Sequence, residues 1–307
     1  MGSSTARPTA SRTWAGMLLT TVLACTVVLG SVVADDRPQS FDTGLLWRIS
    51  GPGIGDSFVL GTIHVPDPRV STIAKPVADA LAQSRMLATE LVLGATDTGG
   101  VELEEFDDGR RLEPLIGSEA FGLLRAALME QGVSERATER MKPWAAMLRI
   151  ARVAPRSDST SLDEQLLHAA RSRRMRVAPL EAVEEQIASF DTVPLDSQVA
   201  LLKHALVHRD ALESTIEPTI DAWLRGDLAA LARIADGVGE QFPDMGRHYR
   251  QLAKHIIDDR TILMHYRLVM PLREGRVFVA VGAMHLYGEH GLLAMLERDG
   301  YRVTRVW

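Results

Sequence analysis

The chain uses one short construction twice: a run of β-forming residues, then Gly-x-x-His, then a loop, a helical pattern and another apolar run. The first copy spans Ser57 to His64, and the second spans Arg276 to His285. A buried strand that ends at the glycine sets the histidine near its carboxyl end, and open α/β sheets gather their sites at that edge. The two copies predict an α/β fold and raise the question of whether His64 and His285 meet.

The residues after each histidine complete a strand–helix–strand unit. The first unit has helical spacing over 71–84 and a β-like apolar run over 86–93. The second has a helical pattern over 289–299 and an alternating final strand over 301–306. Such units normally join two parallel strands by a right-handed crossover. Their similarity predicts a pseudo-symmetric pair on one mixed central sheet.

The middle of the chain is mostly helical in pattern, with one strand-like interruption. Apolar residues recur at helical spacing in six segments: 118–131, 142–153, 161–174, 195–213, 217–225 and 244–273. The interruption is an apolar run from Arg176 to Leu180, followed by Glu181 and a helical pattern over 182–190. No low-complexity tract or clear linker follows residue 40. We therefore predict a single domain over residues 35–307 with a largely helical middle insertion.

The first 34 residues are predicted to be an export signal. Arg7 and Arg12 precede an uncharged stretch from Trp14 to Ala34, which ends in the small residues typical of a cleavage site. The stretch is close to the roughly 20 residues that span a bilayer, so an uncleaved membrane anchor over 14–34 is the alternative. We expect a periplasmic or secreted protein that meets a membrane only if this segment is retained.

The charge and the cysteine count exclude several classes of function. The formal net charge is −6 and no Lys/Arg-rich run is present, which argues against a nucleic-acid partner. Cys25 is the only cysteine, and it lies inside the predicted signal. The mature chain would then carry no thiol, which excludes disulfides, cysteine nucleophiles and thiolate metal ligands.

Two histidines and two glutamates are the first candidates for chemistry. The imidazoles of His64 and His285, brought together, would suit a divalent metal such as Mn, Co or Zn, with carboxylates or water as the other ligands. Glu90 stands in an apolar run, where a carboxylate needs a partner or a ligand unless it faces solvent from an edge strand. Glu181 opens a predicted helix, where capping alone would explain it. Arg260 is either a surface ion pair or an anion clamp.

The other histidines fit surface positions by their spacing. His204 and His208 lie four apart on a predicted helix, a spacing that can chelate a metal. No His-Glu-x-x-His sequence accompanies them, so we interpret them as part of a solvated helix face. His248, His255 and His265 fall in a polar helical segment, and we expect them at the surface.

The motifs around these candidates, taken in order, resemble the TraB/GumN family, which includes the Tiki metalloproteases. They run from about residue 45 to the C-terminus and comprise Leu60-Gly61-Thr62-Ile63-His64, Thr89-Glu90-Leu91, Lys142-Pro143-Trp144, the run from Leu180 to Gln186, Asp259-Arg260, and the run from Phe278 to Leu286 with Gly288, Gly291 and Gly300-Tyr301. The resemblance implies a mixed α/β sheet with two pseudo-symmetric Gly-x-x-His units, similar to erythromycin-esterase-like and haem-binding ChaN-like proteins.

The resemblance also implies a set of site residues. The best-studied members of the family are metal-dependent proteases that need both motif histidines and a glutamate after the first unit. By position these are His64, His285 and Glu90. Glu181 and Arg260 match further recurrent positions of the family.

The sequence departs from the family pattern at two positions. Thr261 follows Arg260 where the family often has Asn, and Met284 stands where a small residue is more usual. The larger side chain of Met284 is expected to narrow the site.

The residues and the resemblance together lead to one hypothesis and two alternatives. The hypothesis is an exported metal-dependent hydrolase, a peptidase, that acts on a peptide or protein substrate. His64 and His285 would bind the cation with either Glu90 or Glu181, the other glutamate would act as general base, and Arg260 would steady the substrate's carboxylate or the oxyanion. The alternatives are a non-catalytic protein that sequesters peptides, as pheromone-shutdown relatives are thought to do, and haem or iron binding by fold analogy alone.

Overall fold

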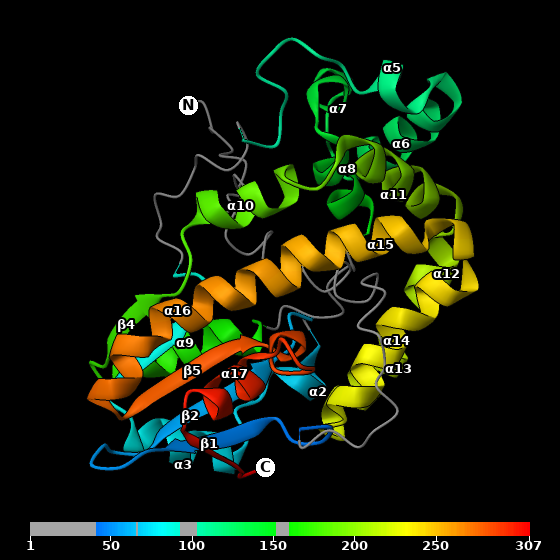
Figure 1. Cartoon of the computed structure of the whole chain (residues 1–307). Helices are drawn as coiled ribbons and strands as arrows, with labels where there is room; N and C mark the ends of the chain where they lie inside the picture. The colour runs from blue at the N-terminus through cyan, green and yellow to red at the C-terminus, as the bar shows by residue number, and fades with distance from the viewer. Residues whose placement is uncertain (1–40, 66, 93–102, 152–159) are drawn as a thin grey trace, which may run out of the picture.

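The computed structural model describes residues 41–65, 67–92, 103–151 and 160–307 (Figure 1). The predicted export signal lies outside the described residues. In the described part of the chain, no helix is long and apolar enough to cross a membrane. A mixed sheet with helices on both faces occupies one side of the molecule, and a larger group of helices lies beside it (Figure 1).

The sheet has six strands in the order β4-β3-β5-β2-β1-β6. Their bounds are β1 (Leu46–Ser50), β2 (Ser57–Thr62), β3 (Met86–Thr89), β4 (Arg176–Pro179), β5 (Val277–Gly282) and β6 (Arg302–Arg305). Strands β2, β5, β3 and β4 are parallel neighbours, whereas β1 is antiparallel to both β2 and β6. The predicted mixed α/β sheet is confirmed.

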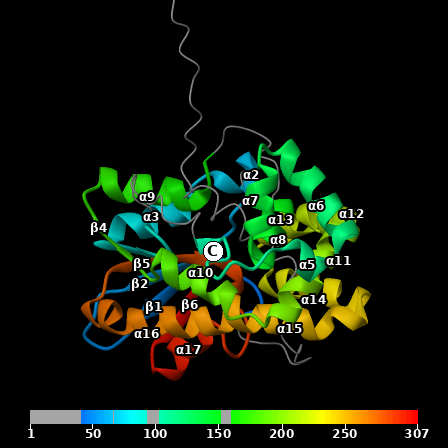
Figure 2. The ribbon, with the colours of Figure 1, turned by 90° about the horizontal axis from the view of Figure 1, so that it is seen from above.

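The two Gly-x-x-His units start from neighbouring strands. β2 and β5 pair in parallel with Thr62 opposite Gly282, so their carboxyl ends lie side by side. The first unit crosses to β3 by way of α3 (Lys75–Gln83), and the second crosses to β6 by way of α17 (Leu292–Arg298). The two crossover helices cover opposite faces of the sheet (Figure 2). The first crossover passes one strand and the second passes two, so the units share strand direction but not the number of strands crossed.

The two central strands are buried along their whole length. All six residues of β2 and all six of β5 are buried. Such continuous burial is typical of parallel strands that carry helices on both faces. The interior positions of both strands are apolar, and β2 carries its polar side chains, Ser57 and Thr62, at its two ends.

The helical middle follows the predicted segments, with additional breaks. The helices are α2 (Pro68–Ser71), α5 (Glu113–Ile116), α6 (Ser118–Glu130), α7 (Glu135–Arg140), α8 (Pro143–Ile150), α9 (Leu162–Ser172), α10 (Val183–Asp191), α11 (Leu195–Val207), α12 (Arg209–Ser214), α13 (Ile216–Leu224), α14 (Leu228–Gln241), α15 (Gly246–Ala253) and α16 (Asp259–Glu274). The segment 195–213 is broken at His208. Helix α14 was not predicted, because Gly237 and Gly239 weaken its helical pattern.

A π-helical turn joins two of these helices next to the sheet. This turn, η2 (Lys254–Asp258), connects α15 to α16, so the helical rod runs without a loop from Gly246 to Glu274. π-turns inside α-helices occur frequently at functional sites. Arg260 and Thr261, which follow the turn directly, are both buried.

Two histidines that were predicted to face solvent are buried instead. His204 on α11 and His248 on α15 are 8% and 6% exposed. Helices α11 and α15 pack against each other, and this contact covers both side chains. Nδ1 of His248 lies 2.9 Å from Oγ of Ser197 on α11, so this polar pair is satisfied inside the helix contact. The surface prediction was therefore wrong for these two residues.

Candidate metal centre at the sheet edge

Four predicted site residues lie just past the carboxyl ends of four parallel strands. His64 follows β2, Glu90 follows β3, Glu181 follows β4, and His285 closes a 3-10 turn, η3 (Ala283–His285), after β5. Each of the four is at most 3% exposed. Strand β3 is internal to the sheet, so the alternative in which Glu90 faces solvent from an edge strand is wrong.

The two motif histidines meet at Glu90. Nε2 of His64 and Nε2 of His285 each lie 3.8 Å from the same oxygen, Oε1 of Glu90. That oxygen also accepts a hydrogen bond of 2.6 Å from the backbone N–H of Gly282. Nε2 of His64 is buried and has no hydrogen-bond partner among the described residues. The structure thus brings together His64, His285 and Glu90, which are 221 positions apart at their extremes.

The glycines of the two motifs lie where groups of other elements approach closely. A Cβ on Gly282 would stand 3.3 Å from Oε1 of Glu90 and 3.4 Å from Nε2 of His64, and would fill the space between them. A Cβ on Gly61 would come within 2.9 Å of Leu286 and 3.0 Å of the Ala283 backbone, so the second motif presses directly on the first. In each motif, the glycine is the position at which residues of the other unit make their close contact.

The Nδ1 side of the His64 ring is held by Asp163, a carboxylate that the sequence did not indicate. Nδ1 of His64 lies 3.0 Å from Oδ2 of Asp163, and the hydroxyl of Thr62 donates to Oδ1 of Asp163 over 2.9 Å. Burial by itself lowers the pKa of His64, but Asp163 and Glu90 outweigh burial and raise this pKa to about 10. In the absence of another cation, His64 is therefore the imidazole that carries the positive charge.

His285 is held by a hydroxyl instead. Nδ1 of His285 lies 2.7 Å from Oγ1 of Thr261, which also donates to the carbonyl of Ile257 over 2.7 Å. Burial lowers the pKa of His285 to about 3, with the charges of Arg260 and His64 acting in the same direction against Glu90. His285 is therefore the neutral imidazole of the pair. Thr261, one of the two departures from the family pattern, supplies its partner.

Arg260 ties Glu90 to Glu181. Nη2 of Arg260 donates to both carboxylates over 2.7 Å, Nε donates to Glu181, and Nη1 donates to the carbonyl of Ile256. Burial favours the neutral form of Glu90, but Arg260 and the two imidazoles hold the pKa of Glu90 well below its ordinary value. The pKa of Glu181 is raised, because burial outweighs Arg260 there. The pKa values of the two glutamates that share Arg260 are thus shifted in opposite directions: the pKa of Glu90 is lowered and that of Glu181 is raised.

Glu181 does not act as a helix cap. The cap of α10 is Ala182, whose N–H donates to the Glu185 side chain over 2.7 Å. Glu181 precedes the cap and places both of its oxygens on Arg260. The capping explanation for Glu181 is therefore replaced by a buried ion pair.

The Lys142-Pro143-Trp144 motif supports the helix that follows Glu181. Lys142 donates to one carboxylate oxygen of Asp191 over 2.7 Å, and the indole N–H of Trp144 donates to the other over 2.6 Å. Asp191 is the last residue of α10, and the Trp144 ring stacks on Phe190 with centroids 5.2 Å apart. This motif fixes α10 and does not reach into the candidate site itself.

Two imidazole nitrogens and a carboxylate oxygen are suitable ligands for a divalent cation, but in this structure they stand farther apart than the ligands of a bound ion do. In the parts of the chain that the structure describes, no group of three or more His, Cys, Asp or Glu side chains is arranged so that it could hold a metal ion. Ligands of a tetrahedral ion stand about 3.4 Å apart, whereas each imidazole Nε2 is 3.8 Å from Oε1 of Glu90. The unpartnered Nε2 of His64 is the atom that such a cation would satisfy.

Two residues of this site escaped the sequence analysis. Asp163 stands in the first turn of α9, beside the capping box of Ser161 and Glu164, where an acid is explained by the helix terminus alone. Thr261 was noticed only as a departure from the family pattern. No local signal marks either residue, because each acts on a histidine that belongs to a different element.

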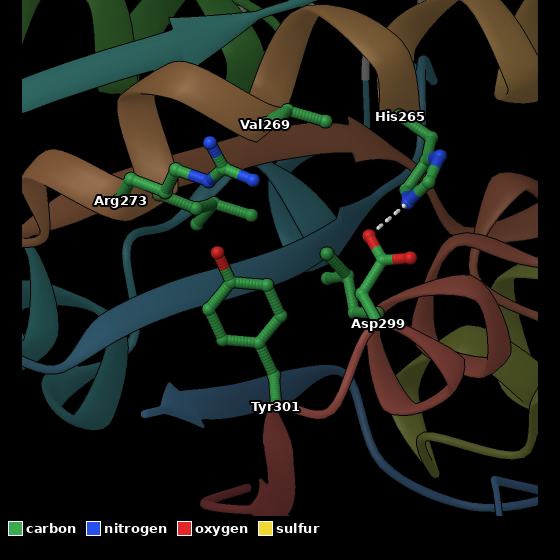
Figure 3. A pocket seen from close by; sticks show the side chains of 7 residues that line it. His265, Val269, Arg273, Asp299 and Tyr301 are labelled. Atoms are coloured by element: carbon green, nitrogen blue, oxygen red, sulfur yellow. Dashed lines mark hydrogen bonds and ion pairs between the residues drawn. The ribbon is translucent and has the colours of Figure 1, made fainter. Parts of the chain in front are cut away.

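A separate pocket lies at the far end of α16 (Figure 3). It has a volume of about 380 Å³ and is lined by His265, Val269, Leu272, Arg273, Leu296, Asp299 and Tyr301. His265 and Asp299 form an ion pair of 2.8 Å across it. None of these lining residues belongs to the candidate site around Glu90, so the pocket is distinct from that site.

Comparison with known proteins agrees with the family that the motifs indicate. The uncharacterized protein YbaP from Shigella flexneri and that from Escherichia coli (strain K12) are each 28% identical to this chain over 258 residues, which covers 81% of this chain and 90% of the relative. No solved structure gives a significant match. The model of the TraB/PrgY/gumN family matches residues 45–305, which include every strand of the sheet and every residue of the candidate site. The chain therefore belongs to the TraB/PrgY/gumN family.

Proposed function

We propose that this protein is an exported metal-dependent hydrolase, a peptidase, in which His64, His285 and Glu90 bind a divalent cation. The observation that carries the proposal is the convergence of two imidazole Nε2 atoms on one carboxylate oxygen, each at 3.8 Å, inside a buried edge of the sheet. In the metal-free site the proton of His64 supplies the positive charge beside Glu90, and a bound cation would take its place. Export is proposed from the character of residues 1–34 alone.

The protonation states of the three side chains support this role. Metal ligands must be an ionised carboxylate and neutral imidazoles. The low pKa of Glu90 and the pKa of about 3 for His285 provide two of the three in the required form. His64 would exchange its proton for the cation. Mixed nitrogen and oxygen ligands suit Zn, Mn or Co.

The bound cation would supply Lewis-acid chemistry, by polarising a scissile carbonyl and acidifying water. The protein's part is to hold its own donors in place. Glu90 is favoured over Glu181 as the third ligand, because Oε1 of Glu90 faces both histidines whereas both oxygens of Glu181 accept hydrogen bonds from Arg260.

Glu181 and Arg260 take supporting roles in this proposal. Arg260 keeps Glu90 ionised and fixes its direction through the 2.7 Å hydrogen bond to Oε2. Glu181, whose pKa is raised by burial, is the general-base candidate, since a base works best when its pKa approaches the operating pH. In this conformation both oxygens of Glu181 are held by Arg260, so a role as base, or a role for Arg260 on the substrate, requires Arg260 to move.

Metal content tests the cation directly. The purified protein is loaded with Zn²⁺, Mn²⁺ or Co²⁺, dialysed and analysed for bound metal, alongside His64→Ala, His285→Ala and the double variant. We expect about one ion per chain in the wild type and a large loss in each variant. The exposed His168→Ala is the control for loss of any histidine. Equal metal content in the wild type and the double variant would refute the proposal.

Peptide turnover separates hydrolysis from sequestration. The metal-loaded protein is incubated with a peptide library, and the products are followed by mass spectrometry. Cleavage that disappears in Glu90→Gln would support the hydrolase, whereas peptides that are retained intact would support the non-catalytic alternative. A metal-loaded protein that neither cleaves nor retains any peptide would contradict both.

A further inference from the structure

We infer that Asp163 and Thr261 are positioning residues. Thr261 keeps the proton of neutral His285 on Nδ1, and Asp163 keeps a proton on Nδ1 of His64 when that imidazole gives up its other proton, so that both Nε2 atoms can face Glu90 without a proton. The consequence for metal binding rests on the proposed function. The assignment of the two protons rests only on the hydrogen bonds of this structure.

At His64, the Asp163 carboxylate can only accept hydrogen bonds. Oδ1 of Asp163 receives the hydroxyl proton of Thr62 over 2.9 Å, and Oδ2 faces Nδ1 of His64 at 3.0 Å. A carboxylate offers no proton to Nδ1, so Nδ1 must carry its own. In neutral His64 the other nitrogen, Nε2, is then bare. This is the carboxylate–histidine arrangement that orients metal-binding imidazoles in many proteins.

On the second histidine, a backbone carbonyl fixes the direction of the hydrogen bond. Thr261 has one hydroxyl proton, and its Oγ1 lies 2.7 Å from the carbonyl oxygen of Ile257, which can only accept. This bond to the preceding helical turn is a common one for threonine. Oγ1 must therefore accept the proton of Nδ1 of His285 over 2.7 Å, which leaves Nε2 of His285 bare as well.

The two positioning residues come from opposite faces of the sheet. Asp163 lies in α9 on one face, and Thr261 lies in α16 on the other (Figure 2). Each helix therefore orients the histidine of one Gly-x-x-His unit. Side chains that hold metal-binding histidines typically change metal affinity about 10- to 100-fold when they are removed.

The variants are chosen to change the acceptor and to preserve the shape. Thr261→Val keeps the volume and removes the acceptor, and Thr261→Ser is its matched control because it keeps the hydroxyl. Asp163→Asn keeps the shape of Asp163 and can turn a donor toward Nδ1. Glu164→Gln weakens the same helix terminus without touching His64, since Glu164 caps α9 through the Ser161 N–H at 2.8 Å.

Two readouts are measured on the full chain. Affinity for Co²⁺ is followed by its absorption spectrum and by calorimetry. The proton position on each imidazole is read from ¹⁵N NMR of histidine-labelled protein, metal-free and with Zn²⁺, with His64→Ala and His285→Ala used to assign the signals. A merely structural role would lower stability but would not move a proton from Nδ1 to Nε2.

We expect Thr261→Val to move the His285 proton to Nε2 and to weaken Co²⁺ binding about 10- to 100-fold, with Thr261→Ser close to the wild type. Asp163→Asn should weaken Co²⁺ binding by a similar factor, and Glu164→Gln should not. An unchanged proton position on His285 in folded Thr261→Val would overturn the inference, as would Co²⁺ affinities of Thr261→Val and Asp163→Asn within about twofold of the wild type. If the wild type binds no Co²⁺, the proposed function fails, and the NMR of the metal-free protein still tests the proton assignment at His285.

Discussion

Arg260 and Glu90 stand 170 positions apart in the chain, and Nη2 of Arg260 donates to Oε2 of Glu90 over 2.7 Å. Both side chains are almost fully buried, and the same arginine also neutralises Glu181. Removing one partner of a buried ion pair leaves an uncompensated charge, which is far more costly than the loss of a surface pair. Arg260 therefore joins the ends of β3 and β4, which carry Glu90 and Glu181, in addition to being part of the candidate site.

The first prediction concerns the stability that Arg260 provides. Arg260→Met is expected to lower the free energy of unfolding by about 3–5 kcal/mol, because Glu90 and Glu181 would be left buried and unpaired. Arg260→Lys should recover only part of this loss, since an ammonium group cannot reproduce the forked contacts. Urea denaturation followed by circular dichroism measures both.

The control is an arginine whose ion pair is exposed. Arg209 pairs with Glu213 one helical turn away over 3.0 Å, and both side chains are about half exposed. Arg209→Met is expected to change the free energy of unfolding by less than about 0.5 kcal/mol. Similar losses for Arg209→Met and Arg260→Met would show that the buried ion pairs of Arg260 contribute no more to the free energy of unfolding than an exposed ion pair does.

The second prediction concerns the space between the three site side chains. Gly282→Ala is expected to abolish or strongly weaken metal binding, because the new methyl group would lie 3.3 Å from Oε1 of Glu90 and 3.4 Å from Nε2 of His64. It should also lower the melting temperature, since these buried groups must move apart. Gly122→Ala on α6 is the control, because a Cβ there meets nothing within 4 Å.

The control variant, Gly122→Ala, should raise the stability that Gly282→Ala lowers. An alanine in a helix interior is favoured over glycine by roughly 0.5–1 kcal/mol, so Gly122→Ala is expected to raise the melting temperature and leave metal binding intact. Full metal affinity in Gly282→Ala would mean that the cation does not occupy the space beside Gly282.

The third prediction concerns the pH dependence of stability. His204 is buried against the rings of His208 and Phe242, and its Nε2 has no hydrogen-bond partner among the described residues. Burial, with the charge of His208, lowers the pKa of His204 from 6.5 to about 4 in the folded protein. As the pH falls, the unfolded chain therefore takes up this proton first.

The sign of the effect follows from that order. The contribution of His204 is intact above about pH 6.5 and is lost between about pH 6.5 and pH 4, by at most about 3 kcal/mol. Unfolding free energies are measured for the wild type and His204→Phe across this range, and the wild type should lose unfolding free energy relative to the variant as the pH falls. Parallel curves would show that His204 does not titrate differently in the two states. The exposed His168→Phe is the control for the loss of a histidine.

The fourth prediction concerns the family motif Lys142-Pro143-Trp144. Asp191→Ala is expected to cost about 1–3 kcal/mol, because the indole N–H of the buried Trp144 would lose its acceptor. Lys142→Met removes the other contact to the same carboxylate and should cost less than about 1 kcal/mol. Equal costs for the two variants, measured by urea denaturation, would contradict the assignment of Trp144 as the main partner.

The two Gly-x-x-His motifs were enough to predict the fold class and the central strands. β-Forming runs that end at glycine gave the correct strands, and the apolar patterns between them gave most of the helices. Where the prediction failed, the cause was contact with another element. His204 was expected on a solvated helix face because no His-Glu-x-x-His sequence accompanies it, and His248 was expected at the surface because its segment is polar. Instead, the contact between α11 and α15 buries both.

The sequence by itself also determined which side chains were candidates, because His64, Glu90, Glu181 and His285 each follow an apolar strand. The tertiary structure decided how they pair. Strand β5 lies between β2 and β3, which carries His285 to Glu90, and α16 places Arg260 between the two glutamates.

The partners Asp163 and Thr261 could come only from the structure. A hydrogen bond acts over about 3 Å, whereas the sequence pattern of a helix reports only which of its faces is apolar. Asp163 approaches His64 across 99 positions, and Thr261 approaches His285 across 24, from helices whose own patterns are complete without them. Local patterns therefore determined the strands and the ends at which the site lies, and the packing of two helix layers on the sheet decided how the site is completed.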